Sequence, residues 1–175
     1  MNACFGGHLA VVERLIERDV DILNTDTNGD TPFSLACLSG NTDVVKLLIE
    51  NKCDIHKPNN DGITPLMNAC GKGHLSVVKV LMENNVDIST TDKEGNTPLY
   101  FSCSGGNIDI VNLLIDGDGN LMNPNYNGQT PLMNACSKGY LPIVKFLIGR
   151  GADIENGDNH GQTPIFGRVS EVTLM

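Results

Sequence analysis

Residues 92–99 read Asp-Lys-Glu-Gly-Asn-Thr-Pro-Leu, and their Thr-Pro pair recurs at a constant step along the whole chain. The pair stands at residues 31–32, 64–65, 97–98, 130–131 and 163–164, so each copy follows the last by 33 residues without insertion or deletion. Two glycines, a small residue and a cysteine keep the same step. A period this regular over five units predicts a stack of repeated supersecondary modules and argues against one closed core.

Each unit also has a local interpretation. Thr-Pro predicts the start of a short helix, because Thr caps the first turn and Pro suits the first helical position. In the second unit this helix should run from Pro65 to Gly71, and a second helix with apolar residues at helical spacing should run from about Leu75 to Glu83. A polar loop and an extended hairpin follow. The hairpin tip carries a glycine, Gly95 in the central unit, because the turn requires a positive φ.

The period and these motifs together resemble the ankyrin repeat, whose unit reads roughly D-x-x-G-x-T-P-L-H-x-A, then a glycine turn, then an apolar helix ending in G-A-D. Residues 92–99 and 151–153 match this pattern well. The resemblance covers nearly the whole chain and implies an all-α repeat solenoid, an ankyrin-type stack of helix-turn-helix units joined by β-hairpin loops. We expect a single ankyrin repeat domain over 1–175, with a partial repeat at 1–23, complete repeats at 24–56, 57–89, 90–122 and 123–155, and a partial or degenerate C-terminal repeat at 156–175.

The chain departs from the family pattern in several places. The family's His after T-P-L is absent, so the usual side-chain to backbone bond between repeats is lost and we expect this column to hold by packing; its members are Ser34, Met67, Tyr100, Met133 and Phe166. The pattern fails after Phe166, which suggests a degenerate cap or a truncation. Met1 falls in mid-helix, so an alternative hypothesis is an ankyrin repeat region cut from a larger multidomain signalling, adaptor or enzyme protein. We expect a monomer in isolation, with uncapped ends that would allow end-to-end association.

Charge narrows the class of partner. The 175 residues include 12 Lys+Arg and 21 Asp+Glu, which gives a formal net charge of −9. This balance argues against nucleic acid and against an anionic membrane surface, since both reward clustered Lys and Arg. No apolar run approaches the roughly 20 residues of a membrane span, and the first residues have no basic leader or apolar core of a secretory signal. We therefore expect no membrane insertion and an intracellular location in the cytoplasm.

Five of the six cysteines share one column: Cys4, Cys37, Cys70, Cys103 and Cys136. Equivalent helices of neighbouring repeats lie about 8–10 Å apart, whereas the Cα atoms of a disulfide lie about 4.4–6.8 Å apart. We therefore interpret the column as small buried residues, and expect Cys53, outside the column, to be the exposed thiol. Without Cys-x-x-Cys or paired His at ligand spacing, no metal site is expected. Unpaired thiols suit a reducing, intracellular setting.

Catalytic and cofactor motifs are missing from the sequence. It contains no Gly-x-Ser-x-Gly, no phosphate-binding loop and no dinucleotide-binding glycine motif. The candidate acids, bases and nucleophiles fall in repeat columns or surface loops and do not converge. Residues 116–120 begin like a calcium loop, but Leu121 and Asn127 stand where Gly and Glu are required. We expect no enzyme activity and no cofactor.

In ankyrin-like stacks, the hairpin tips and the exposed side of the first helix line a continuous concave face, and family ligands are mostly proteins. The resemblance therefore implies a non-catalytic protein–protein interaction scaffold whose partner, another protein, binds this preformed face. Carried over column by column, the partner-binding candidates are Thr27, Asn28, Asp30, Leu38, Asn60, Asp61, Ile63, Lys72, Lys93, Glu94, Asn96, Tyr126, Asn127, Gln129, Lys138 and His160. Tyr126, Ile63 and Leu38 are the best anchor candidates, because large apolar and aromatic groups dominate interface energetics.

Overall fold

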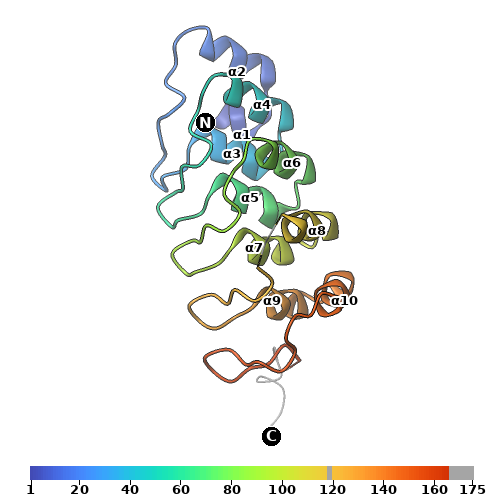
Figure 1. The fold of residues 1–175 in the computed structure, drawn as a ribbon. Coiled ribbons are helices and arrows are strands. Elements are labelled where there is room, and N and C mark those ends of the chain that lie inside the picture. The colour runs from blue at the N-terminus through green and yellow to red at the C-terminus, as the bar shows by residue number, and fades with distance from the viewer. Residues whose placement is uncertain (118–119, 166–175) are drawn as a thin grey trace, which may run out of the picture.

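The computed structural model describes residues 1–117 and 120–165, which form a stack of helix pairs with a loop projecting from each pair to one side (Figure 1). The helices in this part of the chain are α1 (Asn2–Phe5), α2 (Leu9–Ile16), α3 (Pro32–Ser39), α4 (Thr42–Glu50), α5 (Pro65–Lys72), α6 (Leu75–Glu83), α7 (Pro98–Gly105), α8 (Ile108–Asp116), α9 (Pro131–Lys138) and α10 (Leu141–Gly149). The predicted all-α repeat solenoid is confirmed. The second half of the expected degenerate C-terminal repeat, residues 166–175, lies outside the described part.

The first helix of each pair begins and ends as local chemistry predicts. In α7, the Thr97 side chain accepts a hydrogen bond from the backbone N–H of Tyr100 at 3.2 Å, and Pro98 occupies the first helical position. The helix stops at Gly106, whose φ of 75° lies in the left-handed region. The same start and stop recur in α3, α5 and α9, which fixes four helices of equal length in the same register.

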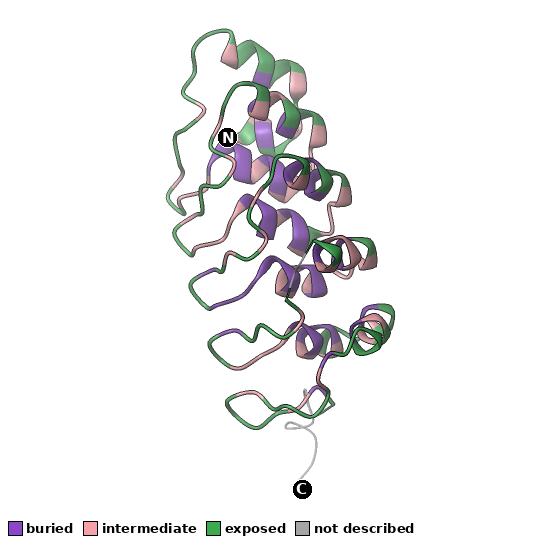
Figure 2. Ribbon diagram, viewed as in Figure 1, coloured by how far each residue is buried: buried purple, intermediate pink, exposed green. Residues whose placement is uncertain are grey.

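The helices form two layers with the core between them. The odd-numbered helices pack on one another along the stack, and the even-numbered helices form the second layer behind them (Figures 1 and 2). Val77, Val78 and Leu81 of α6 are fully buried against this core, as are Cys70 and Cys103 of the cysteine column. Four members of the column are thus confirmed as buried packing residues, whereas Cys136 in the last repeat is half-buried, and all six cysteines are free thiols. None of the described helices is long and apolar enough to span a membrane.

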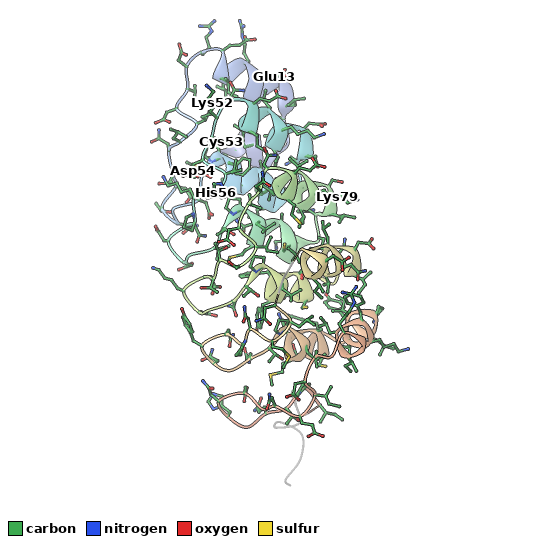
Figure 3. The ribbon with its side chains drawn as sticks, viewed as in Figure 1. Glu13, Lys52, Cys53, Asp54, His56 and Lys79 are labelled. Carbon is green, nitrogen blue, oxygen red and sulfur yellow. The ribbon has the colours of Figure 1, made fainter. Side chains whose placement is uncertain are left out.

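Cys53 is not the exposed thiol that the sequence suggested. Its side chain is half-buried and packs against the core from the segment that follows α4 (Figure 3). Removal from water, followed by the nearby Asp54 carboxylate, raises the pKa of the Cys53 thiol to about 12. A loop position in the repeat pattern therefore does not make a side chain accessible, because the side chain can still pack against the core.

The projecting loops contain no strand anywhere in residues 1–117 and 120–165, so the term β-hairpin overstates their structure. Each loop closes on itself through two backbone bonds, as in Asp92 N–H to the Asn96 carbonyl at 3.1 Å and Gly95 N–H to the Asp92 carbonyl at 3.1 Å. It pairs with the preceding loop through one further backbone bond near the tip. This is too few bonds for a strand ladder, but enough to hold every loop in the same direction.

Side-chain bonds between repeats come mostly from columns other than the family's His column. At the start of the second helix, a polar side chain reaches back to a carbonyl of the preceding repeat. The bonds are Asn41 Nδ2 to Phe5 O at 3.0 Å, His74 Nε2 to Leu38 O at 3.1 Å and Asn107 Nδ2 to Gly73 O at 3.1 Å. At the position of the family's His, the side chains of this protein mostly pack against their neighbours, as the fully buried Met67 does. Tyr100 is the exception, because its hydroxyl donates to Gln129 Oε1 of the next repeat at 3.1 Å.

Candidate partner-binding surface

Each projecting loop is rigid because a side-chain carbonyl or carboxylate caps it from within. Asp92 Oδ1 accepts from the backbone N–H of Glu94 at 2.9 Å and of Asn96 at 2.8 Å. An Asp or Asn side chain makes the same two bonds in every other loop, from positions 26, 59, 125 and 158. This local Asx geometry fixes the turn without help from a strand. The tip side chains are therefore presented on a preformed backbone.

The tips are also tied to one another. The backbone N–H of Lys93 donates to the Asp61 carbonyl at 2.9 Å, and that of Tyr126 donates to the Glu94 carbonyl at 2.9 Å. Equivalent bonds join the first tip to the second and the fourth to the fifth, at 2.9 and 3.0 Å. The five tips consequently form one continuous row along the side of the stack (Figure 1).

The capping column alternates between carboxylate and amide along the stack, as Asp26, Asn59, Asp92, Asn125 and Asp158. Each amide uses its N–H to bond backwards: Asn125 Nδ2 donates to Asn96 Oδ1 at 2.8 Å, and Asn59 Nδ2 donates to Asp30 Oδ1 at 3.3 Å. An aspartate in every loop would line up like charges where water is partly excluded, and none could donate. The sequence analysis missed this role, although the alternation is visible in the sequence.

The structure removes Asn96 from the candidate surface. Only 6% of Asn96 is exposed, and its side chain is already engaged by Asp92 Oδ2 at 2.9 Å and by Asn125. Its column serves the junctions between repeats, as Gln129 also shows by accepting from Tyr100 of the preceding repeat. The Asn96 amide therefore serves the junction between loops, and its role as a partner contact stays a prediction that this burial does not favour.

The other candidates separate into two groups by exposure. Exposed side chains belong to Thr27, Asn28, Asn60, Asp61, Lys72, Lys93, Glu94, Tyr126, Asn127, Lys138 and His160. Half-buried side chains belong to Asp30, Leu38, Ile63 and Gln129. Tyr126 is 71% exposed at its tip, so it is the most available of the three suggested anchors. The sequence analysis missed Phe5, an exposed aromatic in the column of Leu38, because the candidates were taken only from later repeats.

The comparison with known families agrees with this geometry. A family model described as ankyrin repeats (3 copies) matches residues 1–92 and 85–158. The chain belongs to the ankyrin repeat family. Ankyrin repeats are in general protein-interaction modules and are typically non-catalytic. No curated protein matches this ankyrin array significantly.

The partner-binding candidates of the ankyrin array together carry no formal net charge, in contrast to the chain as a whole, because Lys72 and Lys138 at the ends of α5 and α9 offset acidic residues of the loops. The charged candidates are three acidic side chains and three lysines, which are Asp30, Asp61, Glu94, Lys72, Lys93 and Lys138. The acidic excess of the chain consequently lies outside this set. Contacts on this face would thus depend on polar and aromatic groups more than on net charge.

A hollow of about 210 Å³ lies where the last loops meet the first-helix layer of the array. Its lining includes Tyr100 of α7, Met133, Asn134 and Ser137 of α9, and Gln162 of the last loop. Asn134 Nδ2 is committed to the Tyr100 carbonyl at 3.0 Å, so the wall is fixed. The face is therefore a shallow groove with at least one side-chain-sized depression.

No cluster of three or more His, Cys, Asp or Glu side chains suited to a metal ion occurs in the described part of the array. The calcium-like segment 116–120 includes residues 118–119, which lie outside it.

Proposed function

We propose that this ankyrin array is a non-catalytic scaffold that binds another protein through the face formed by its loop tips and the exposed side of its first helices. The observation that carries the proposal is Tyr126, a 71% exposed aromatic side chain on a backbone already fixed by the Glu94 carbonyl and by the Asn125 cap. An anchor on a preformed loop loses little conformational freedom when it binds, so most of the contact energy is retained as affinity.

The partner should present an apolar or aromatic pocket for Tyr126, bordered by hydrogen-bonding groups for the tips. Around Tyr126 the tip side chains are Lys93, Glu94 and Asn127, all exposed. Opposite charges on one tip favour a partner surface that is itself mixed in charge. The association rate should therefore change little with ionic strength, unlike that of a partner steered by the net charge of the chain.

The test compares the proteins captured by three immobilised forms of the chain, quantified by mass spectrometry. The forms are the unchanged chain, Tyr126→Ala, and Lys79→Ala as the control. Lys79 is exposed on α6, on the opposite side of the stack from the loops (Figure 3). A protein bound through the tip row should be lost with Tyr126→Ala and kept with Lys79→Ala.

The purified partner should then bind Tyr126→Ala at least about tenfold more weakly, since truncation of an anchor costs about 1.4 kcal/mol or more. Equal affinity for the unchanged chain and Tyr126→Ala would contradict the proposal, as would an equal loss with Lys79→Ala. Matching melting temperatures for the three forms are required for the comparison.

A further inference from the structure

Three Asn-Gly pairs occur in the chain, at residues 28–29, 127–128 and 156–157. This dipeptide favours spontaneous deamidation, because glycine has no side chain to hinder the ring closure that starts the reaction. In that step the backbone nitrogen of the glycine attacks the side-chain amide carbon of the asparagine. The rate therefore depends on whether the nitrogen is free and whether the asparagine can turn towards it, and the structure separates the three pairs on both points.

The two pairs at loop tips are held by hydrogen bonds. Gly128 N–H donates to the Asn125 carbonyl at 2.9 Å, and Asn127 N–H donates to Asn125 Oδ1 at 3.0 Å. The pair at residues 28–29 is bonded to Asp26 in the same way, at 3.0 and 2.8 Å. A glycine nitrogen in such a turn can attack only after the turn opens, because both its N–H and the preceding backbone are fixed.

The third pair lies in the last loop, before the capping residue Asp158. Asn156 is exposed, and its backbone N–H donates to Asp153 Oδ1 at 3.3 Å. Among the atoms of residues 1–117 and 120–165, neither the Asn156 side-chain amide nor the Gly157 N–H has a hydrogen-bond partner. Both reacting groups of this pair are therefore available without a change in the fold.

The inner loops show that this availability belongs to the loop position. Pro58 and Pro124 occupy the position of Gly157 and have no N–H to donate. Thr25 and Thr91 occupy it in the other two loops, and their N–H groups donate no hydrogen bond within the described residues. The preceding side chain is exposed in three inner loops, as Asn24, Lys57 and Asn123. An adjoining repeat thus leaves both groups accessible.

We propose that Asn156 is a site of spontaneous deamidation in the folded chain, whereas Asn28 and Asn127 are protected by their turns. The Gly157 nitrogen, after loss of its proton to hydroxide, attacks Cγ of Asn156. A bond forms between these atoms, the bond from Cγ to Nδ2 breaks, and the departing nitrogen takes a proton from water and leaves as ammonia. Water then opens the succinimide ring at either carbonyl, which leaves aspartate or isoaspartate at residue 156.

Either product changes the last loop. It places a carboxylate two residues before that of Asp158. Isoaspartate also lengthens the backbone next to Gly157, where space is short, since a Cβ on Gly157 would lie 2.9 Å from the Gly161 carbonyl carbon. The same loop braces the tip before it, because Asn159 Nδ2 donates to the Tyr126 carbonyl at 2.9 Å. The reaction itself does not depend on the proposed partner binding.

The experiment incubates the unchanged chain in reducing buffer at mildly alkaline pH, folded and in urea, and follows each asparagine by peptide mapping with mass spectrometry. In urea the three pairs should react at similar rates. In the folded chain Asn156 should react at close to its urea rate. Asn28 and Asn127 should react at least about tenfold more slowly than in urea, because opening each turn breaks two hydrogen bonds.

Pro124→Gly is the matched variant, since it creates an Asn-Gly pair at residues 123–124, the same loop position one repeat earlier. Asn123 should then deamidate in the folded variant as Asn156 does. Continued protection of Asn127, in the tip of the same loop, shows that the loop has kept its fold.

Three results would overturn the proposal. The first is an Asn156 that is as well protected in the folded chain as the tip asparagines. The second is a pair of tip asparagines that react at their urea rates. The third is an Asn123 that stays intact in the folded Pro124→Gly variant, since the reaction would then not belong to this loop position.

Discussion

Gly106→Ala should destabilise the protein much more than Gly73→Ala, although both glycines end the first helix of their repeat in the left-handed conformation. Gly106 ends α7 with a φ of 75°, and Gly73 ends α5 with a φ of 76°. A Cβ on Gly106 would lie 2.7 Å from Cζ of Tyr140, in the next repeat. A Cβ on Gly73 would lie 3.5 Å from its nearest neighbour, the Gly105 carbonyl oxygen, which is an ordinary contact.

The two costs can be separated from these distances. Holding an alanine in the left-handed region costs roughly 1–2 kcal/mol at either position. At Gly106, the half-buried Tyr140 ring must also move, and overpacking of this kind costs typically about 1–3 kcal/mol more. We therefore expect a loss of about 1–2 kcal/mol in the free energy of unfolding for Gly73→Ala and about 2–5 kcal/mol for Gly106→Ala.

Urea unfolding monitored by circular dichroism measures both losses, and Tyr140→Ala identifies their origin. In the Tyr140→Ala background the ring is absent, so Gly106→Ala should cost no more than Gly73→Ala does in the unchanged chain. The difference is the coupling energy of a double-mutant cycle. Equal losses for the two single glycine variants would refute the steric argument, and so would a Gly106→Ala loss that is unaffected by Tyr140→Ala.

Three further predictions concern polar and titratable groups. Asn125→Ala should lower the free energy of unfolding by about 1–3 kcal/mol, because it removes the loop cap and leaves the buried Oδ1 of the Asn96 side chain without its donor. Asn125→Asp should lower the free energy of unfolding by less. Equal urea midpoints for the unchanged chain and both variants would contradict this. Burial raises the pKa of the Cys103 thiol to about 12 from an ordinary 9.0. As pH rises above 9, the unfolded chain therefore loses this proton before the folded chain does. The free energy of unfolding is highest below pH 9 and declines as pH rises towards 12. By pH 10 this decline is about 1.4 kcal/mol per thiol, and in reducing buffer Cys103→Ala should lose that much less stability than the unchanged chain between pH 8 and 10. Arg150→Ala should cost less than about 1 kcal/mol in the same urea assay, because its ion pair with Asp116 at 3.2 Å is exposed to solvent.

The helices of this protein were predictable because their boundaries depend on a few adjacent residues. The expected second helix of the second full unit, Leu75 to Glu83, has the bounds of α6, and the expected first helix ends one residue before Lys72, the last residue of α5. Thr-Pro at one end and a left-handed glycine at the other determine the first helix within eight residues. A strict repeat then transfers each local result to every other unit.

Contacts between repeats could not be predicted in the same way, because they join residues 29 to 37 positions apart whose identities vary. Variation within a column can reflect a free surface, or pairing with an equally varied neighbouring column. The sequence analysis assigned both Asn96 and Tyr126 to the first class. Only the stacking geometry shows that Asn96 is enclosed by Asp92 and Asn125, whereas the Tyr126 ring remains outside.

This distinction also predicts where binding specificity can be varied in the array. The column of Lys93 and Tyr126 projects from the tips, and its backbone N–H groups hold the loops together. Asn60 and Asn159 in the same column add side-chain bonds, from Nδ2 to the carbonyls of Thr27 at 3.1 Å and of Tyr126 at 2.9 Å. The column of Asn96 and Gln129 contributes its side chains to the junctions between repeats. A substitution of Lys93 or Tyr126 leaves the backbone junction bonds in place, whereas a substitution of Asn96 or Gln129 removes a bond that a neighbouring repeat requires. The tip column can therefore change with the partner at little cost in stability, and the junction column can change only together with its neighbours.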